Sequence, residues 1–183
     1  MKTRAAALRM LLSVALPAAA AGSVGTSEPH LQSACPGTSM PTQRFVDNGD
    51  GTVTDSVSKL MWMRCALGQS WKADTCTGAA GMLNWPQAQR QAQRLNQQAQ
   101  AFYNDWRVPN MRELASITDS RCATPRTNPS VFPHTPAASF WTATARPGEP
   151  AGQRVFVLSF GWAGAAPALK DEQHHVRLVR TGP

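Results

Sequence analysis

Short runs of alternating or uniformly apolar residues recur after residue 44, and they predict a domain rich in strands. Residues 45–54 place two β-like runs on either side of an Asp-Asn-Gly-Asp-Gly turn, a pattern typical of a hairpin. A third apolar run at 60–63 extends the hairpin into a small meander. Further strand-like runs occur at 140–144, 154–160 and 175–180, and the second of these gives the strongest signal. In the last run, Val176 and Leu178 are expected to point inward.

A helical pattern begins at Asn84, a good N-cap, and Pro86 is tolerated in its first turn. The apolar positions that recur at helical spacing predict a buried stripe: Trp85, Ala88, Ala92, Leu95 and Ala99. Arg90 and Arg94 lie four residues apart on the opposite face, where glutamines are their neighbours. A solvated face and an anion-binding strip both explain this pair.

A second helix is predicted within the stretch 105–119. Asn110 is the expected N-cap, and Glu113 completes a capping box three residues later. Pro109 disfavours the helical conformation in the residue before it, so the helix cannot begin earlier. Trp106 is expected to anchor this corner to the core, at about 2–3 kcal/mol of burial energy. Two helices with strands on both sides predict an α+β domain.

The N-terminus has the pattern of a secretory signal peptide. Three basic residues precede or interrupt a short apolar run at 10–16, and an alanine-rich stretch follows it. A retained membrane anchor is the alternative, but the run is short for a bilayer span. The predicted organisation is a signal peptide at 1–21, an extended segment at 22–43 and one domain at 44–181. We therefore expect a secreted or periplasmic protein without stable membrane insertion.

Four cysteines behind a signal peptide predict two disulfides formed in an oxidising compartment. Three pairings are open. Cys65–Cys76 is favoured because the segment between the two resembles a single loop, which leaves Cys35–Cys122 as the second bridge.

The composition is mildly basic. Without residues 1–21 the formal charge falls from +7 to +4, and the remaining chain has 12 arginines and 3 lysines. This excess permits an anionic partner but does not require one. Beside Arg90 and Arg94, a second candidate cluster is formed by Arg121 and Arg126, with Arg146, around a proline-rich loop at 121–139.

Several segments together resemble one known family. They are FVDNGDGTVTD at 45–55 with LMW at 60–62, DWRVP at 105–109 with REL at 112–114, FWT at 140–142, and VRLVR at 176–180. Over residues 44–180 the chain resembles the Lcl C-terminal domain family, named for the C-terminal domain of a bacterial collagen-like adhesin. The resemblance implies a C-type-lectin-like fold: two helices, a small twisted antiparallel sheet and long loops.

The resemblance also implies a binding role. The adhesin binds sulfated glycosaminoglycans through this domain and is trimeric. The printed sequence contains no collagen-like Gly-x-y repeat, so trimerisation is not carried over and the oligomeric state stays open. The motifs do not contain the family's binding residues, so no site is carried over either. Within the motifs, Trp62, Trp106 and Trp141 are expected to be core anchors. Arg107 is expected to pair with Asp105 or to donate to turn carbonyls.

No pattern of catalytic residues is found. Cysteines paired in disulfides provide no nucleophilic thiol, and the Gly-x-Ser-x-Gly motif of serine hydrolases does not occur. His174 and His175 are adjacent, so on a strand their side chains would point to opposite faces and could not bind one metal together. We expect both histidines to lie on the surface. Asp47, Asp50 and Asp55 do not match calcium-loop spacing, and turn chemistry explains them, although a weak metal site stays open. We therefore expect no catalytic residue, metal ligand or cofactor.

The predicted function is non-catalytic, adhesin-like binding of a sulfated or acidic polysaccharide, with no role for nucleic acid. The alternative is a protein-interaction module in a cell-envelope or pilus assembly, which predicts a contiguous apolar patch. An enzyme is a third possibility, and it would require a pocket with convergent titratable groups.

Overall fold

The computed structural model describes residues 40–98, 103–148, 153–162 and 164–182 of the 183-residue chain. The predicted signal peptide, almost all of the segment 22–43, Cys35 and Ala99 lie outside these residues. No helix in the described ranges combines the length and the hydropathy that a bilayer span requires.

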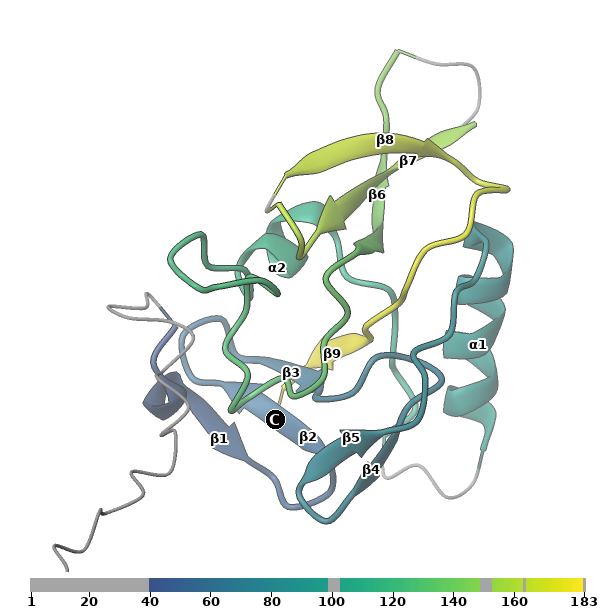
Figure 1. Cartoon of the computed structure of the whole chain (residues 1–183). Helices are drawn as coiled ribbons and strands as arrows, with labels where there is room; N and C mark the ends of the chain where they lie inside the picture. The colour runs from purple at the N-terminus through teal and green to yellow at the C-terminus, as the bar shows by residue number, and fades with distance from the viewer. Residues whose placement is uncertain (1–39, 99–102, 149–152, 163, 183) are drawn as a thin grey trace, which may run out of the picture. The chain divides into compact units, whose positions relative to one another are not determined.

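A four-stranded antiparallel sheet contains the predicted meander. Its strands are β1 (Phe45–Asp47), β2 (Thr52–Asp55), β3 (Leu60–Met63) and β9 (Val179–Thr181), in the order β1-β2-β3-β9 (Figure 1). A 3-10 helix, η1 (Thr42–Arg44), precedes β1. Gly49 and Gly51 have positive φ angles in the β1–β2 turn, a conformation that glycine adopts without steric cost.

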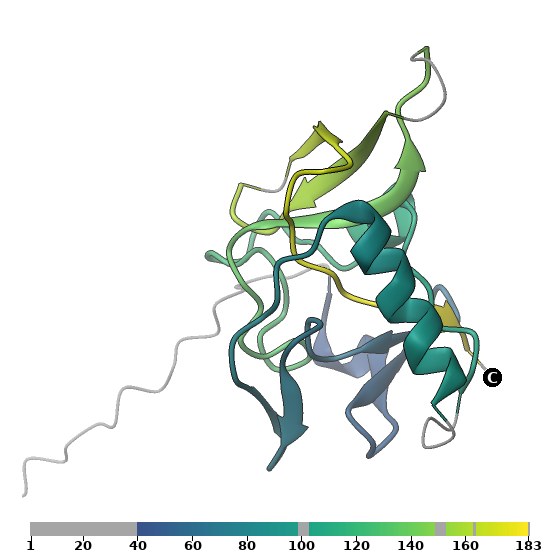
Figure 2. The same ribbon diagram turned by 90° about the vertical axis from the view of Figure 1, so that its right-hand side faces the viewer.

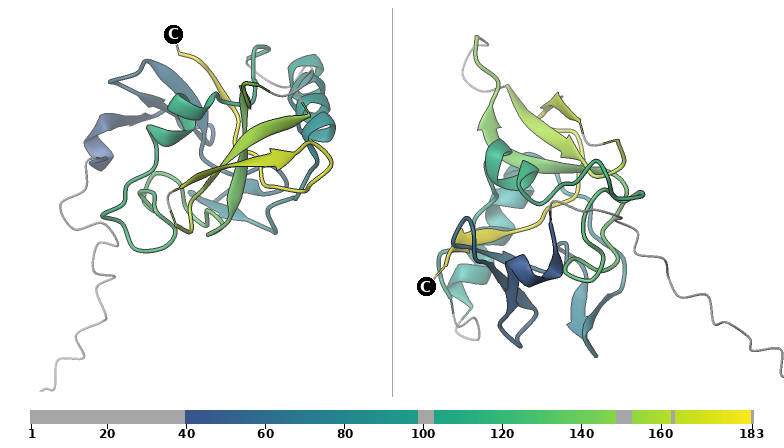
Figure 3. Two further views of the ribbon diagram at one scale, coloured as in Figure 1. Left: turned by 90° about the horizontal axis from the view of Figure 1, so that it is seen from above. Right: turned by 90° about the vertical axis from the view of Figure 1, so that its left-hand side faces the viewer.

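A second antiparallel sheet consists of β6 (Ser139–Ala145), β7 (Arg154–Ser159) and β8 (Ala165–Leu169). Figure 3 shows it in a different part of the domain from the four-stranded sheet. The sequence predicted β6 and β7 but not β8, because the run Ala-Ala-Pro-Ala-Leu lacks β-branched residues and contains a proline. β8 is an edge strand of this sheet, where Pro167 is tolerated opposite Phe156.

The segment between Cys65 and Cys76 is a hairpin, not the single loop that the sequence predicted. β4 (Ser70–Lys72) pairs with β5 (Thr75–Thr77) across a two-residue turn. Ala73 and Asp74 both have positive φ angles in this turn, as a type I′ hairpin requires. Alanine is unusual in that conformation, so the turn gave no sequence signal.

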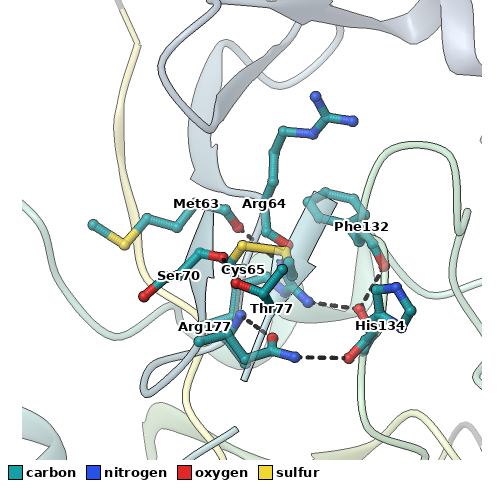
Figure 4. The surroundings of a disulfide bond; sticks show 12 residues. Met63, Arg64, Cys65, Ser70, Thr77, Phe132, His134 and Arg177 are labelled. Carbon is teal, nitrogen blue, oxygen red and sulfur yellow. Dashed lines mark hydrogen bonds between the residues drawn. A yellow bond between two sulfur atoms is a disulfide. The ribbon is translucent and has the colours of Figure 1, made fainter. Parts of the chain in front are cut away.

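The Cys65–Cys76 disulfide is confirmed, with a Cα–Cα distance of 5.4 Å. Figure 4 shows Met63, Arg64 and Arg177 gathered around it. The second predicted bridge cannot be compared with the structure, since Cys35 is outside the described residues. Cys35–Cys122 therefore stays a prediction.

Both helices begin where the sequence predicted. α1 (Trp85–Gln97) has Asn84 as its N-cap, and α2 (Met111–Ala115) has Asn110. Each cap forms a full capping box: the asparagine side chain accepts from the backbone N–H three residues later, and that residue's side chain accepts from the cap's N–H. Over the described residues the fold is therefore α+β with two α-helices and small antiparallel sheets, as predicted.

The predicted tryptophan anchors are buried in the core. Trp62 belongs to a cluster between the two sheets with Leu114 and Phe140. Trp106 and Trp141 belong to a second cluster, against which α1 packs through Ala88 and Ala92.

Arg107 and Arg180 each form an ion pair with a carboxylate. Arg107 forms two bonds of 2.7 Å with Glu113, so its predicted pairing with Asp105 is wrong; Asp105 accepts from Arg180 at 2.5 Å. Burial raises the pKa of the Glu113 carboxyl, but the hydrogen bonds from Arg107 and from the Asn110 N–H, together with the positive charge of Arg107, outweigh burial and hold that pKa below its usual value.

The two adjacent histidines are structural, and the predicted surface role is wrong for His175. His175 is buried, and its Nδ1 lies 2.9 Å from the carbonyl oxygen of Gly81. The ring of His174 packs edge-on against Trp141, with a centroid distance of 4.7 Å.

Candidate functional site

One face of α1 lines a surface hollow. Gln87, Arg90, Gln91 and Arg94 occupy positions i, i+3, i+4 and i+7, so their side chains share one face of the helix. Together with Leu83 they surround a hollow of about 220 Å³. The structure thus places the predicted arginine pair and two of the predicted glutamines around one concave surface.

The opposite face of α1 fixes the helix to the domain. Ala88 and Ala92 are buried against the core. Near the C-terminal end, the Asn96 amide accepts from the backbone N–H of Trp106 and donates to its carbonyl oxygen, both at 2.8 Å. The polar face is therefore presented to solvent by a helix that is held at both ends, by the capping box and by Asn96.

Arg90 and Arg94 are exposed, and the described ranges contain no ion-pair partner for either. They differ in this from five other arginines, each of which lies within 3.3 Å of a carboxylate: Arg44, Arg64, Arg107, Arg121 and Arg180. α1 itself contains no aspartate or glutamate. Within the described residues, the carboxylates that pair with arginines therefore do so away from Arg90 and Arg94.

Helix stability does not explain the pair. Like charges at i and i+4 destabilise a helix by about 0.2–0.5 kcal/mol. Arg94 gains some compensation in the last turn from the helix dipole, but Arg90 is in the middle of the helix. A bound anion between the two guanidinium groups would turn this repulsion into attraction.

A second hollow adjoins the first, and its walls are mainly apolar. It has a volume of about 210 Å³, and its lining residues are Leu67, Gly68, Gly81, Leu83, Gln91 and Leu95. Leu83 and Gln91 line both hollows. We call the two hollows together the α1 groove. The chain between β5 and α1 supplies part of one wall and runs beside the helix in Figure 1, and Figure 2 shows it joining the N-terminal end of α1.

Backbone and ring contacts position the loop wall of the α1 groove. Gly81 donates to the carbonyl oxygen of Leu67 at 2.7 Å, and Leu83 exchanges two backbone hydrogen bonds with His174. The Trp141 indole Nε1 donates to the Leu83 carbonyl oxygen at 2.6 Å. Leu83 is therefore tied to the core by a completely buried side chain.

The structure separates Arg146 from the other two arginines of the second predicted cluster. Arg121 and Arg126 lie in one loop, but Arg121 Nε donates to Asp119 at 3.3 Å and Arg126 Nη1 donates to the carbonyl oxygen of Ser120 at 3.0 Å. Arg126 bonds to the backbone at the Phe160 end of β7, whereas Arg146 bonds to the backbone at Arg154, the other end. Six strand residues separate these ends by roughly 20 Å, so Arg146 does not join the other two.

The acidic β1–β2 turn is explained by its own hydrogen bonds. Asp47 accepts from the Gly49 N–H and from Arg64, and Asp50 accepts from Thr52. Asp55 accepts from Arg44, Ser58 and the Val57 N–H. Within the described residues no three side chains of metal-ligating type come together. These contacts support the turn interpretation of the aspartates.

Sequence reasoning missed the apolar half of the α1 groove. Leu67, Gly81 and Leu83 belong to irregular segments, where no periodicity indicates which side chains face a cavity. The close approach of Gly68 to Gly81 also depends on tertiary structure, because a Cβ on Gly68 would lie 2.5 Å from the Gly81 nitrogen.

Comparison with protein families defines the class of this domain. Residues 51–180 match the Lcl C-terminal domain. This match spans most of the chain, so the protein belongs to the Lcl C-terminal domain family, which confirms the resemblance seen in the sequence. None of the curated proteins compared with the chain matches it.

Proposed function

We propose that this protein is a non-catalytic, adhesin-like domain that binds an acidic or sulfated polysaccharide through the α1 groove. The observation that carries the proposal is the exposed pair Arg90 and Arg94, which lines a hollow without any carboxylate partner in the described part of the chain. Membership of the Lcl C-terminal domain family supports an adhesin-like role.

The side chains of the groove suit this ligand. A guanidinium group binds sulfate or carboxylate with two parallel hydrogen bonds. The Gln87 amide oxygen already accepts from the Asn84 N–H, so its NH₂ group is left to donate to a sugar oxygen. Gln91 lies one turn further along the same face, and its amide can both donate and accept. Anionic groups and hydroxyls of a sugar chain could therefore be bound side by side.

The proposal also includes the architecture of the domain, its location and its non-catalytic role. Family membership supports a C-type-lectin-like architecture, and the predicted signal peptide supports a secreted or periplasmic location. Four of the described histidine and cysteine side chains have structural contacts: Cys65 with Cys76, His174 with Glu172, and His175 with Gly81. These contacts support a binding role over an enzymatic one.

A protein-interaction module has less support. The large apolar side chains that are exposed in the described ranges come from five separate segments: Val46, Val57, Met82, Trp162 and Leu169. A contiguous apolar patch, which this alternative predicts, would require them to gather on one surface.

Replacement of the arginine pair tests the proposal. We expect the variant Arg90→Gln/Arg94→Gln to bind immobilised heparin about tenfold more weakly at physiological salt, because each exposed charge pair contributes up to about 1 kcal/mol. The slope of log affinity against log salt should fall by about two, one for each lost cation. The measurement is retention of the oxidised domain on a heparin surface across a salt gradient.

The matched control is Lys72→Gln/Arg112→Gln, which removes the same charge from two exposed positions outside α1. We expect it to change affinity by less than about twofold, because the net charge alone has a small effect at physiological ionic strength. Equal losses in the two double variants would show that binding follows net charge, and would contradict the proposed site.

A further inference from the structure

The three-stranded sheet has one covered edge and one open edge. On the β6 side, Trp141 donates to the carbonyl oxygen of His175. Ala143 donates in the same way to Pro109, so other segments of the chain cover this edge. On the other side, β8 pairs with β7 alone among the described strands (Figure 1). The unpaired backbone groups of such an edge are a template to which a further strand can add.

The residues of this open edge favour strand addition. No charged residue occurs between Arg154, where β7 begins, and Lys170, directly after β8. Alternate side chains of β8 are exposed, and all of them are apolar: Ala165, Pro167 and Leu169. A short, uncharged strand at an open edge is a common site of association between copies of a protein, unless the edge is blocked.

The register of β8 shows which of its backbone groups face outward. Ser159 on β7 donates to the carbonyl oxygen of Gly164, just before β8, at 2.9 Å. Because hydrogen-bonded and non-bonded pairs alternate in an antiparallel ladder, the residues of β8 that bond to β7 are the even-numbered ones. The backbone groups of Ala165, Pro167 and Leu169 therefore point away from β7, toward the open edge.

Two of these three outward positions cannot donate to an added strand. Pro167 has no backbone N–H. The Leu169 N–H already donates to Glu172 Oε1 at 2.8 Å, and the Leu169 carbonyl oxygen accepts from the Glu172 N–H at 3.1 Å. Of the three described positions, Ala165 alone keeps an N–H for a further strand.

The Glu172 carboxylate is held in place at both oxygens. Oε2 lies 3.3 Å from His174 Nε2, and the His174 ring packs edge-on against Trp141. The hydrogen bond from the Leu169 N–H is the main cause of the lowered pKa of Glu172, against a smaller opposing effect of burial. The carboxyl group therefore stays ionised at neutral pH, and this form accepts hydrogen bonds most strongly.

The geometry points to an edge guard, formed by Pro167 and Glu172, that prevents β8 from pairing with β8 of a second copy of this domain. Pro167 blocks the middle of the strand, and Glu172 occupies the backbone groups at its end. A second copy fits this edge because two identical uncharged strands can pair antiparallel about a two-fold axis without like charges meeting. The edge guard does not depend on the proposed function, since neither residue lines the α1 groove.

Removal of the edge guard from the oxidised domain is the test. In the variant Pro167→Thr/Glu172→Ala, position 167 gains an N–H and the Leu169 N–H loses its acceptor. We expect this variant to self-associate at about tenfold lower protein concentration than the wild type, because each added backbone hydrogen bond strengthens the pairing of two strands. The measurement is sedimentation velocity over a concentration series at neutral pH, with circular dichroism to confirm folding.

The matched control is Pro147→Thr/Asp171→Ala, which makes the same two kinds of replacement at exposed positions outside β8. We expect it to sediment as the wild type does. A further variant adds Ala165→Lys to the domain that lacks the edge guard. This variant should return to wild-type behaviour, because a charged side chain on an edge strand opposes pairing.

Amide hydrogen exchange tests the Glu172 contact within a single chain and does not require the double variant to fold. We expect the Leu169 N–H to exchange about tenfold faster in Glu172→Ala than in the wild type, since a hydrogen bond to a charged group is lost. Glu172→Gln keeps an acceptor of the same shape and should retain most of the protection. Equal exchange in Glu172→Ala and the wild type would remove Glu172 from the edge guard.

Three results of the sedimentation experiment would overturn the inference. A folded Pro167→Thr/Glu172→Ala variant that sediments as the wild type would show that the edge guard does not limit pairing. Association of the control to the same degree would show that the replacements act without regard to β8. Association that Ala165→Lys leaves unchanged would place the contact on another surface. None of these results affects polysaccharide binding, which the arginine variants test separately.

Discussion

Replacement of Trp141 with alanine is expected to lower the free energy of unfolding by about 3–5 kcal/mol, the usual cost of removing a large buried aromatic side chain. Trp141 is completely buried on β6 and packs edge-on against Trp85 and His174. Its removal leaves a cavity where α1, β6 and the segment before β9 meet. The measurement is chemical denaturation of the oxidised wild-type and variant domains. Their free energies of unfolding can be compared directly if both unfold with the same m-value, the slope of free energy against denaturant concentration.

A conservative variant separates stability from function. Trp141→Phe keeps most of the packing but removes the indole N–H that donates to Leu83. We expect a smaller loss of stability, about 1 kcal/mol, because the Leu83 carbonyl oxygen loses one of its two donors and keeps the His174 N–H. Polysaccharide affinity should also fall, since Leu83 lines both hollows.

The control for Trp141 is Trp162→Ala, because the Trp162 side chain is exposed and should contribute less than about 1 kcal/mol. A loss below about 1 kcal/mol for Trp141→Ala would contradict the assignment of Trp141 as the connection between the core and the α1 groove.

Replacement of Arg177 with methionine is expected to cost about 3 kcal/mol, because several buried acceptors would lose their donor together. Arg177 is completely buried and donates to the carbonyl oxygens of Met63 and Arg64, and to the Thr135 hydroxyl at 2.6 Å. Its guanidinium group also lies over the ring of Phe132, 4.7 Å from the centroid. This side chain therefore joins the end of β3 to the proline-rich loop.

One effect opposes this loss. Burial lowers the pKa of Arg177 to about 9, which shows that burying the cation costs free energy, although the side chain stays protonated at neutral pH. Methionine would remove that cost. The unpaired acceptors and the lost ring contact outweigh it, since methionine fills much of the volume but offers no donor.

Two further variants test whether the loss of stability comes from the hydrogen bonds of the buried Arg177 side chain. Arg177→Lys retains the charge but not the planar fork, so we expect it to recover only part of the lost stability. Arg112→Met changes an exposed arginine and should alter stability by less than about 0.5 kcal/mol. An unchanged or increased stability of Arg177→Met would show that desolvation dominates at this site.

Local signals in the sequence predicted the helix starts and the meander, because capping boxes and glycine turns depend on residues within a few positions. The same reasoning failed for β8 and for the β4–β5 hairpin, where pairing with a partner strand overrides weak local preference. The run 175–180 shows this most clearly. Its alternation predicted that Val176 and Leu178 point inward, but Arg177 is buried as well, because both faces of this segment are covered.

The sequence likewise predicted one part of the candidate site and not the other. Helical periodicity placed Arg90 and Arg94 on one polar face, and the structure confirms that arrangement. The hollow beside them depends on a loop wall that comes from a separate segment, which no periodic pattern indicates. Arg146 lies at one end of the β6–β7 pair, whereas Arg121 and Arg126 lie near the other end. The sequence did not indicate this separation, because it depends on how the strands pair.

The most direct test of the account is to map ligand contacts in solution. The ¹⁵N-labelled, oxidised domain is titrated with an acidic oligosaccharide, and chemical shift changes are followed for the backbone amides and the arginine Nε–H groups. We expect the largest changes at the Nε–H groups of Arg90 and Arg94 and at the backbone amides of residues 83–95. Changes centred on the loop 119–126, with Arg90 and Arg94 unaffected, would contradict it.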